Sequence, residues 1–172
     1  VGPLPLVALE DLLAQFASEA SPLFVALDNL QDPHNFGAIV RTALCVGACG
    51  VLIPKDRSVP PSPAVSKASA GALEHIKVAR VINLARTIED LKERGLWLVG
   101  AEGSGKAPWH AFDYTVPVGI VLGSEGKGLR PLVRKRCDAV LSIPLYGRIT
   151  SLNVAAAAAV FLFEAARQRH KG

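Results

Sequence analysis

Residues 23–53 read LFVALDNLQDPHNFGAIVRTALCVGACGVLI and divide into three parts. Residues 23–27 are a continuous apolar run, which is typical of a strand covered on both faces. A polar turn follows, and residues 36–46 then have the apolar spacing of a helix. Residues 50–53 are a second apolar run. A strand, a helix and a strand in this order predict two parallel strands joined by a crossover helix.

The same alternation continues through the rest of the 172 residues, a length that suits one domain. We therefore expect an α/β fold with a mostly parallel sheet and helices on both faces. Asn83 is expected to cap one of the helices, with Gly95 as its stop. Further helices are expected at residues 9–20, 64–73, 84–94, 129–136 and 152–169, and further strands at residues 77–81, 96–100, 116–122 and 139–143.

The composition narrows the class of protein. Half of the residues are apolar and only 20% are charged, which excludes a disordered chain. The longest apolar stretch, near residues 153–163, is too short and too weakly hydrophobic to cross a bilayer, so we expect a cytoplasmic protein with no membrane partner. The net charge of +4 permits an acidic partner such as RNA but does not identify one. The three cysteines have no metal-binding spacing, and no metal is expected.

The first polar turn, at residues 28–35, leaves the strand at residues 23–27 and enters a helix. Asn35 is expected at the start of this helix, where its amide can cap the helix or reach a ligand. Arg41 projects from the second turn, and its guanidinium suits a phosphate. The alternative is an ordinary turn with a capping asparagine and a surface arginine.

The second turn, GSEGKG at residues 123–128, follows the apolar run of residues 116–122. Its glycines allow the backbone to approach a ligand closely. The pattern is neither G-x-G-x-x-G nor a P-loop, and Glu125 would repel a phosphate. A cofactor without phosphate, such as S-adenosylmethionine, fits better. The alternative is a plain tight turn.

The third segment, IPLYGRITSLNV at residues 143–154, links the last predicted strand to an Ala-rich helix. Thr150 or Ser151 is expected to cap that helix, which would place Asn153 inside its first turn. The small residues 155–159 would let the helix pack closely. The alternative is an ordinary capped helix with a tight interface.

Taken together and in this order, the three segments resemble motifs one, two and three of the SpoU branch of the SPOUT methyltransferases. The resemblance covers residues 23–169. It implies an α/β fold whose C-terminal segment forms a deep trefoil knot, and a homodimer. It also implies transfer of a methyl group from S-adenosylmethionine to the 2′-hydroxyl of an RNA ribose.

The resemblance also assigns roles to individual residues. The family assigns removal of the hydroxyl proton to the motif-one arginine, which corresponds to Arg41. An arginine stays protonated in proteins, so a grip on the substrate phosphate and stabilisation of the developing alkoxide are easier roles. The expected catalytic residues are Arg41, Asn35, Glu125, Ser151 and Asn153. The expected cofactor-binding residues are Gly123, Ile143, Leu152, Leu122, Gly126 and Leu145.

Residues 51–58, 68–74, 80–86 and 161–169 are similar to bacterial family members that methylate a guanosine in the peptidyl-transferase P loop of 23S rRNA. Those members carry an additional N-terminal RNA-binding domain. We therefore expect residues 1–20 to be a linker remnant with a lead-in helix, and residues 21–172 to be the catalytic domain.

Three alternatives remain open. The same chemistry on tRNA or on another rRNA site is one, and a non-catalytic RNA-binding factor of ribosome assembly is another. A dinucleotide-dependent oxidoreductase is a weaker third, because it needs a glycine fingerprint after the first strand. That strand leads instead into Asp32-Pro33-His34-Asn35.

Overall fold

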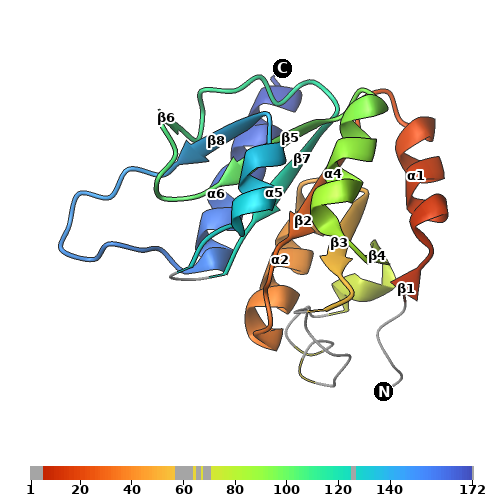
Figure 1. Cartoon of the computed structure of the whole chain (residues 1–172), viewed down its shortest axis with the longest axis horizontal. Coiled ribbons are helices and arrows are strands. Elements are labelled where there is room, and N and C mark those ends of the chain that lie inside the picture. The colour runs from red at the N-terminus through yellow and green to blue at the C-terminus, as the bar shows by residue number, and fades with distance from the viewer. Residues whose placement is uncertain (1–5, 57–63, 65–66, 68–70, 125–126, 172) are drawn as a thin grey trace.

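The structure is a computed structural model, and it describes residues 6–56, 64, 67, 71–124 and 127–171. The described residues form one sheet of eight strands in the order β1-β4-β3-β2-β7-β5-β8-β6, and every pairing is parallel (Figure 1). The strands are β1 Leu6–Val7, β2 Leu23–Leu27, β3 Gly50–Pro54, β4 Lys77–Val81, β5 Trp97–Ala101, β6 Ala107–Pro108, β7 Val118–Leu122 and β8 Ala139–Ser142.

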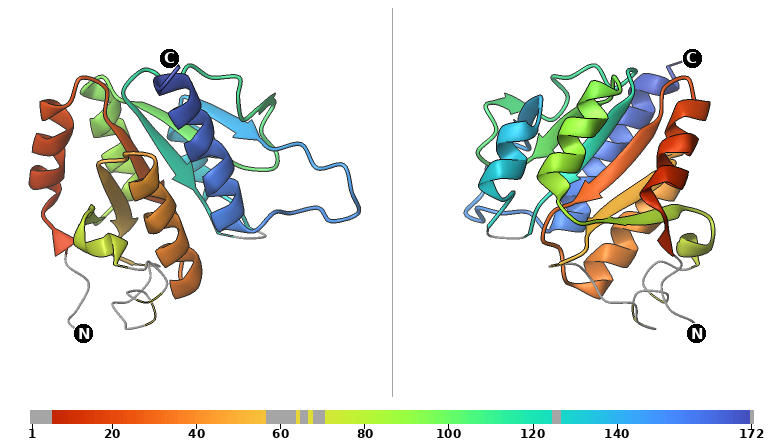
Figure 2. Two further views of the ribbon diagram at one scale, coloured as in Figure 1. Left: turned by 180° about the vertical axis from the view of Figure 1, so that it is seen from behind. Right: turned by 45° about the vertical axis from the view of Figure 1, so that its right-hand side comes forward.

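Helices cover both faces of this sheet, so the predicted α/β architecture is confirmed. Helices α2 and α6 lie on one face, and α1 and α4 lie on the other (Figure 2). The helices are α1 Leu9–Ser18, α2 Pro33–Cys45, the 3-10 turn η1 Ala72–Glu74, α4 Leu84–Glu93, α5 Pro131–Arg136 and α6 Val154–Arg169. Five of the ten residues of the helix expected at residues 64–73 lie outside the described residues, and its last two, Ala72 and Leu73, belong to η1.

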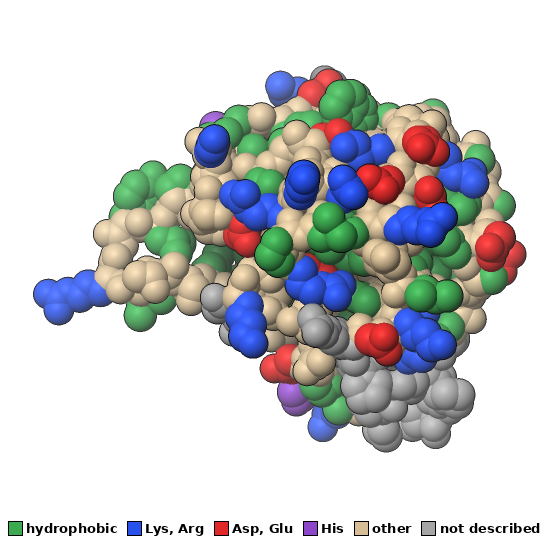
Figure 3. All heavy atoms as spheres, in the orientation of Figure 1, with side chains coloured by type: hydrophobic (Ala, Val, Ile, Leu, Met, Phe, Trp, Pro, Cys, Tyr) green, Lys and Arg blue, Asp and Glu red, His purple; other side chains and the backbone are tan. Residues whose placement is uncertain are grey.

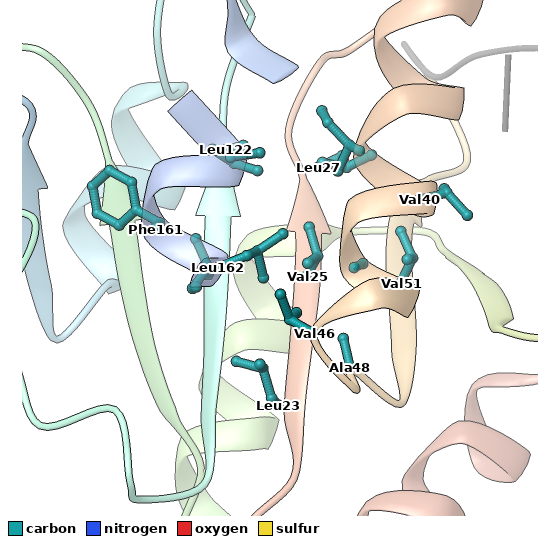
Figure 4. Close-up of a cluster of buried hydrophobic side chains, with 14 of the residues drawn as sticks. Leu23, Val25, Leu27, Val40, Val46, Ala48, Val51, Leu122, Phe161 and Leu162 are labelled. Atoms are coloured by element: carbon teal, nitrogen blue, oxygen red, sulfur yellow. The ribbon is translucent and has the colours of Figure 1, made fainter. Parts of the chain in front are cut away.

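Strand β2 has no polar residue because both of its faces are buried. Leu23, Val25 and Leu27 point toward α2 and α6, where they pack in one core cluster with Phe161 and Leu162 of α6 (Figure 4). The alternate residues of the strand belong to the second cluster, beneath α1 and α4. Successive side chains of a strand point to opposite faces, so a central strand with helices on both sides has no solvent-facing position.

Two helix starts differ from the prediction. Asp32 caps α2, because its carboxylate accepts the backbone N–H groups of His34 and Asn35, so the expectation that Asn35 starts the helix is wrong. The cause is Pro33, whose fixed φ suits the first helical position. Asn153 caps α6, so the assignment of this cap to Thr150 or Ser151 is also wrong. Asparagine is as good a cap as serine.

The topology brings the three polar segments to one edge of the sheet. Strands β2, β7 and β5 are neighbours, so the loops that follow them leave from adjacent carboxyl ends. Strand β8 pairs with β5, and the chain after it projects from the body before it returns to α6 (Figure 1). Two short strands, β1 and β6, were not predicted, because two residues carry no periodicity. Within the described part of the chain, no helix is both long and apolar enough to span a bilayer.

Candidate functional site

A cavity of about 350 Å³ lies beyond the carboxyl ends of β5 and β7, where ligands bind in open parallel sheets. Its walls come from three parts of the chain: the ends of these strands, the turn after β7, and the segment from the end of β8 into α6. The lining residues are Ala101, Glu102, Gly103, Ser104, Leu122, Gly123, Ser124, Lys127, Gly128, Ile143, Leu145, Thr150, Ser151, Leu152, Val154, Ala157 and Phe161.

The turn after β7 closes on itself. The backbone N–H of Gly128 donates to the carbonyl of Ser124 at 2.9 Å, and these two residues form an isolated antiparallel bridge. A Cβ atom at Gly123 would overlap the carbonyl group of Gly128. Gly128 has a φ of 66°, in the left-handed region that favours glycine. Both glycines are therefore required by the path of the backbone at this wall.

Glu102, which follows β5, holds the far end of this turn. Its carboxylate accepts the backbone N–H of Leu129 at 3.0 Å, the hydroxyl of Ser104 at 2.8 Å and Nε of Arg134 at 2.5 Å. Burial raises the pKa of this carboxyl, but the hydrogen bonds from Ser104, Arg134 and Leu129 outweigh it and hold the pKa below its usual value. Sequence reasoning missed Glu102, although it lies two residues after the strand predicted at residues 96–100, where ligand-site residues collect.

Asp28, which follows β2, holds the next residue of the same loop. Its fully buried carboxylate accepts the backbone N–H of Arg130 at 2.7 Å and Nε of the same residue at 2.6 Å. Strands β2 and β5 lie on either side of β7. Two carboxylates from the flanking strands thus hold the consecutive backbone amides of Leu129 and Arg130. Asp28 was also missed, because its partner lies 102 residues away.

The basic cluster at residues 130–136 has a largely structural role. Arg130 pairs with Asp28, Arg134 with Glu102, and Arg136 with Glu89. Lys and Arg side chains are spread over the face that carries α4 and α5, with acidic side chains between them (Figure 3). Three arginines of this cluster are therefore engaged in ion pairs within the protein.

Motifs one and three are in contact. Nδ2 of Asn153 donates to Oδ1 of Asn35 at 3.1 Å, while Oδ1 of Asn153 accepts the N–H groups of Ala155 and Ala156. One asparagine thus caps α6 and also binds the first turn of α2.

A second cavity of about 340 Å³ lies beside the first. Ser124 and Lys127 line both cavities, so the two share one wall. The hydroxyl oxygen of Ser124 is buried and has no hydrogen-bond partner in the described structure. The remaining lining residues come from the turn after β2 and from the start of α2, and they are Asn29, Leu30, Gln31, Asp32 and Asn35.

The structure brings most of the predicted site residues together. Asn35 lines the second cavity, and Asn153 is hydrogen-bonded to Asn35. Arg41 is exposed on α2 and lines neither cavity. Glu125 and Gly126 lie outside the described residues. The first cavity is lined by the predicted residues Leu122, Gly123, Ile143, Leu145, Ser151 and Leu152.

Thr150, Ala157 and Phe161 also line the first cavity without having been predicted, because no sequence signal separates them from ordinary loop and core residues. A search of the described residues finds no group of three or more His, Cys, Asp or Glu side chains that could hold a metal ion.

Comparison with known proteins gives consistent matches. The chain is 48% identical over 163 residues to YacO of Bacillus subtilis, which is named for the TrmH family of tRNA/rRNA methyltransferases. It is also 48% identical over 161 residues to the 23S rRNA (guanosine-2′-O-)-methyltransferase RlmB of Pseudomonas syringae. Each alignment covers 94% of this chain but only 66% and 64% of the relatives. The chain therefore spans slightly less than two thirds of their length.

A solved structure gives the same answer. The SpoU methyltransferase AviRb from Streptomyces viridochromogenes, crystallised in complex with the cofactor AdoMet, matches with a TM-score of 0.85 at 31% identity. This match covers 93% of the present chain and 65% of AviRb. The sequence profile of the SpoU rRNA Methylase family matches residues 22–163, which include both cavities and all three motifs. This chain belongs to the SpoU rRNA methylase family.

Proposed function

We propose that this chain transfers a methyl group from S-adenosylmethionine to the 2′-hydroxyl of a guanosine ribose in 23S rRNA, in the cytoplasm. The observation that carries the proposal is the first cavity. Five of the six residues expected to bind the cofactor line it, although they come from separate parts of the sequence. The similarity to RlmB supports 23S rRNA as the substrate, and the AdoMet complex of AviRb supports the cofactor.

The chemistry of the first cavity fits this cofactor. Leu122, Ile143, Leu145, Leu152 and Phe161 provide an apolar lining, as expected for an adenine ring and the methylene chain of the methionine moiety. The glycine turn exposes backbone groups for hydrogen bonds. The carboxylate of Glu102 is suited to ribose hydroxyl groups or to a positive charge. When bound, S-adenosylmethionine supplies a methyl group already activated by its sulfonium, so the proposed reaction requires no metal ion.

Arg41 has the role of holding the RNA in this proposal. Its guanidinium binds a phosphate beside the target nucleotide and stabilises negative charge as the 2′-oxygen loses its proton. The proton passes to the phosphate or to water. Lys127, which lines both cavities, adds a second positive charge near the substrate. Asn35 and Asn153 hold the starts of α2 and α6 together beside the reacting atoms.

We further propose that the active form is a homodimer. Tyr146, Ile149 and Phe163 are large apolar side chains that are 94%, 75% and 55% exposed. These side chains are candidates for the contact with a second copy, because apolar surface exposed in one subunit is often covered in a dimer. Light scattering on the purified protein tests the proposal, with a dimer expected, and the variant Phe163→Glu is expected to shift the population toward monomer.

The path of the chain end is also part of the proposal. After β8 the chain passes outside the body and returns so that α6 packs on α2 and β7, which are earlier in the sequence. We propose that this return completes the trefoil knot that the family resemblance implies.

The test of the function uses the purified chain, S-adenosylmethionine with a labelled methyl group, and separate samples of unmodified 23S rRNA and tRNA. After digestion to nucleosides, labelled 2′-O-methylguanosine from the 23S rRNA sample is expected. Label in the tRNA sample alone would show that the substrate is tRNA and not 23S rRNA. Binding of either RNA without any label in the nucleosides would support the non-catalytic alternative and overturn the proposal.

A further inference from the structure

The second cavity has a lining that suits a nucleobase. It is adjacent to the first cavity through Ser124 and Lys127, and all of its lining residues except Leu30 have polar side chains. The amide side chains of Asn29, Gln31 and Asn35 line it together with the carboxylate of Asp32. A base placed here would have its ribose at the shared wall, next to the methyl donor. The inference that follows rests on the proposed function.

Asp32 has one oxygen engaged and one available. Oδ1 accepts the backbone N–H of His34 at 2.8 Å and that of Asn35 at 3.3 Å, which fixes the carboxylate at the start of α2. No hydrogen bond to Oδ2 is present in the described parts of the chain. The side chain is exposed and lines the second cavity. The carboxylate thus presents an acceptor whose orientation is set by the helix.

We propose that Asp32 is a specificity-determining residue that accepts hydrogen bonds from the Watson–Crick edge of the target guanine. Guanine has two adjacent donors on this edge, N1–H and the N2 amino group. Adenine and cytosine each present one amino donor beside a ring acceptor, and uracil has a single N–H donor between two carbonyls. A carboxylate accepts only, so it favours guanine over each of the other three bases. The side-chain carbonyl of Gln31 supplies a further acceptor in the same cavity.

The shared wall supports this placement independently. The buried hydroxyl of Ser124 has no partner among the described residues, which is unusual because buried polar groups are nearly always hydrogen-bonded. A ribose at the boundary between the two cavities offers hydroxyl groups within reach of this side chain. The base in the second cavity and the methyl donor in the first would then lie on either side of Ser124.

The test changes the acceptor without removing the helix cap. Asp32→Asn keeps the capping oxygen, because asparagine and aspartate cap equally well, but it places an NH₂ donor where Oδ2 accepted. Asp32→Ser also keeps a cap and removes Oδ2 altogether. Asp90→Asn, on the exposed side of α4, is the matched control for loss of one negative charge. Urea unfolding and calorimetry with S-adenosylmethionine are expected to give wild-type values for all three variants.

The readout is the rate of methyl transfer to two RNAs that differ only at the target nucleotide, which is guanosine or inosine. Inosine lacks the N2 amino group. A good base contact is worth about 1–3 kcal/mol, so the wild-type protein and Asp90→Asn are expected to lose about 5- to 150-fold in kcat/KM on inosine. Both Asp32 variants are expected to be slower on guanosine by a similar factor and to treat the two RNAs alike.

Two results separate the inference from the proposed function. If the Asp32 variants keep the wild-type preference for guanosine over inosine, the assignment of Asp32 is overturned while the methyltransferase function stands. If the wild-type protein methylates neither RNA nor unmodified 23S rRNA, the proposed function itself fails, and the inference fails with it.

Discussion

Asn153 donates a hydrogen bond to Asn35 across 118 residues of sequence, with 3.1 Å between Nδ2 and Oδ1. The bond joins the first turns of α6 and α2, which pack against each other on one face of the sheet. Because Asn153 also caps α6 through its other side-chain atom, one residue both starts a helix and fixes its position. Asn153 of motif three therefore has an architectural role.

This double role gives the first prediction. Asn153→Ala removes the cap and the contact with Asn35, and is expected to lower the free energy of unfolding by about 1–2 kcal/mol. Asn153→Ser keeps a capping hydroxyl but is too short to reach Asn35, and is expected to stay within about 0.5 kcal/mol of wild type. Urea denaturation measures both. Equal stability losses in the two variants would show that the contact with Asn35, and not the helix cap, is the main contribution of Asn153 to stability.

The glycine turn gives a second prediction, with a control from the same cavity. A Cβ atom at Gly123 would overlap the Gly128 carbonyl, whereas a Cβ at Gly103 meets no atom within 4 Å. Overpacking of this kind costs about 1–3 kcal/mol of stability and displaces the backbone of the turn, so Gly123→Ala is expected to weaken S-adenosylmethionine binding. Gly103→Ala is expected to bind normally. Titration calorimetry measures the affinity of both variants for S-adenosylmethionine. Wild-type affinity in Gly123→Ala would contradict the assignment of the turn to the cofactor site.

The buried pair of Asp28 and Arg130 predicts that replacing the arginine costs more stability than replacing the aspartate. The side chain of Asp28 is fully buried, and that of Arg130 is 33% exposed. Arg130→Met leaves a buried carboxylate without its charge partner and is expected to cost about 3–5 kcal/mol of stability. Asp28→Asn leaves an arginine that water can reach, and is expected to cost only about 1–3 kcal/mol. The two midpoints in urea test this, and the reverse order would refute it.

Glu102 predicts a dependence on pH. Its pKa in the folded protein lies below its usual value, so the folded state favours the ionised carboxylate. The resulting stability is present in full above the usual pKa of glutamate and is lost as pH falls toward the lowered pKa of the folded state. Glu102→Gln is therefore expected to be less stable than wild type at pH 7, and the difference is expected to shrink below about pH 4.5. A constant difference from pH 7 to pH 3.5 would mean that ionisation of Glu102 contributes nothing.

Short-range patterns predicted the framework, and the family resemblance predicted much of the lining of the first cavity. The apolar run at residues 23–27 has the same bounds as β2, and the three polar segments follow strands β2, β7 and β8, as predicted. The N-cap of α2 was harder to predict from the sequence. The choice between Asn35 and Asp32 depends on which residue is the first with helical backbone angles. Asp28 and Glu102 both follow strands, which is a signal that the sequence offers, but the partners of their carboxylates could not be predicted from the sequence. Their partners lie 102 and 32 residues away and meet them only once the sheet has formed.

Methyl transfer to a ribose hydroxyl that depends on Arg41 can be detected by alkaline mapping of 23S rRNA. A 2′-O-methyl group blocks alkaline cleavage of the adjacent phosphodiester, because cleavage requires the free 2′-hydroxyl. After incubation with the wild-type protein and S-adenosylmethionine, one guanosine is expected to become resistant to cleavage. Arg41→Ala is expected to bind the cofactor normally and to lose at least about 100-fold in rate. An unchanged cleavage pattern with the wild-type protein would contradict the proposed methyl transfer. Near-normal methylation by Arg41→Ala would contradict the role proposed for Arg41.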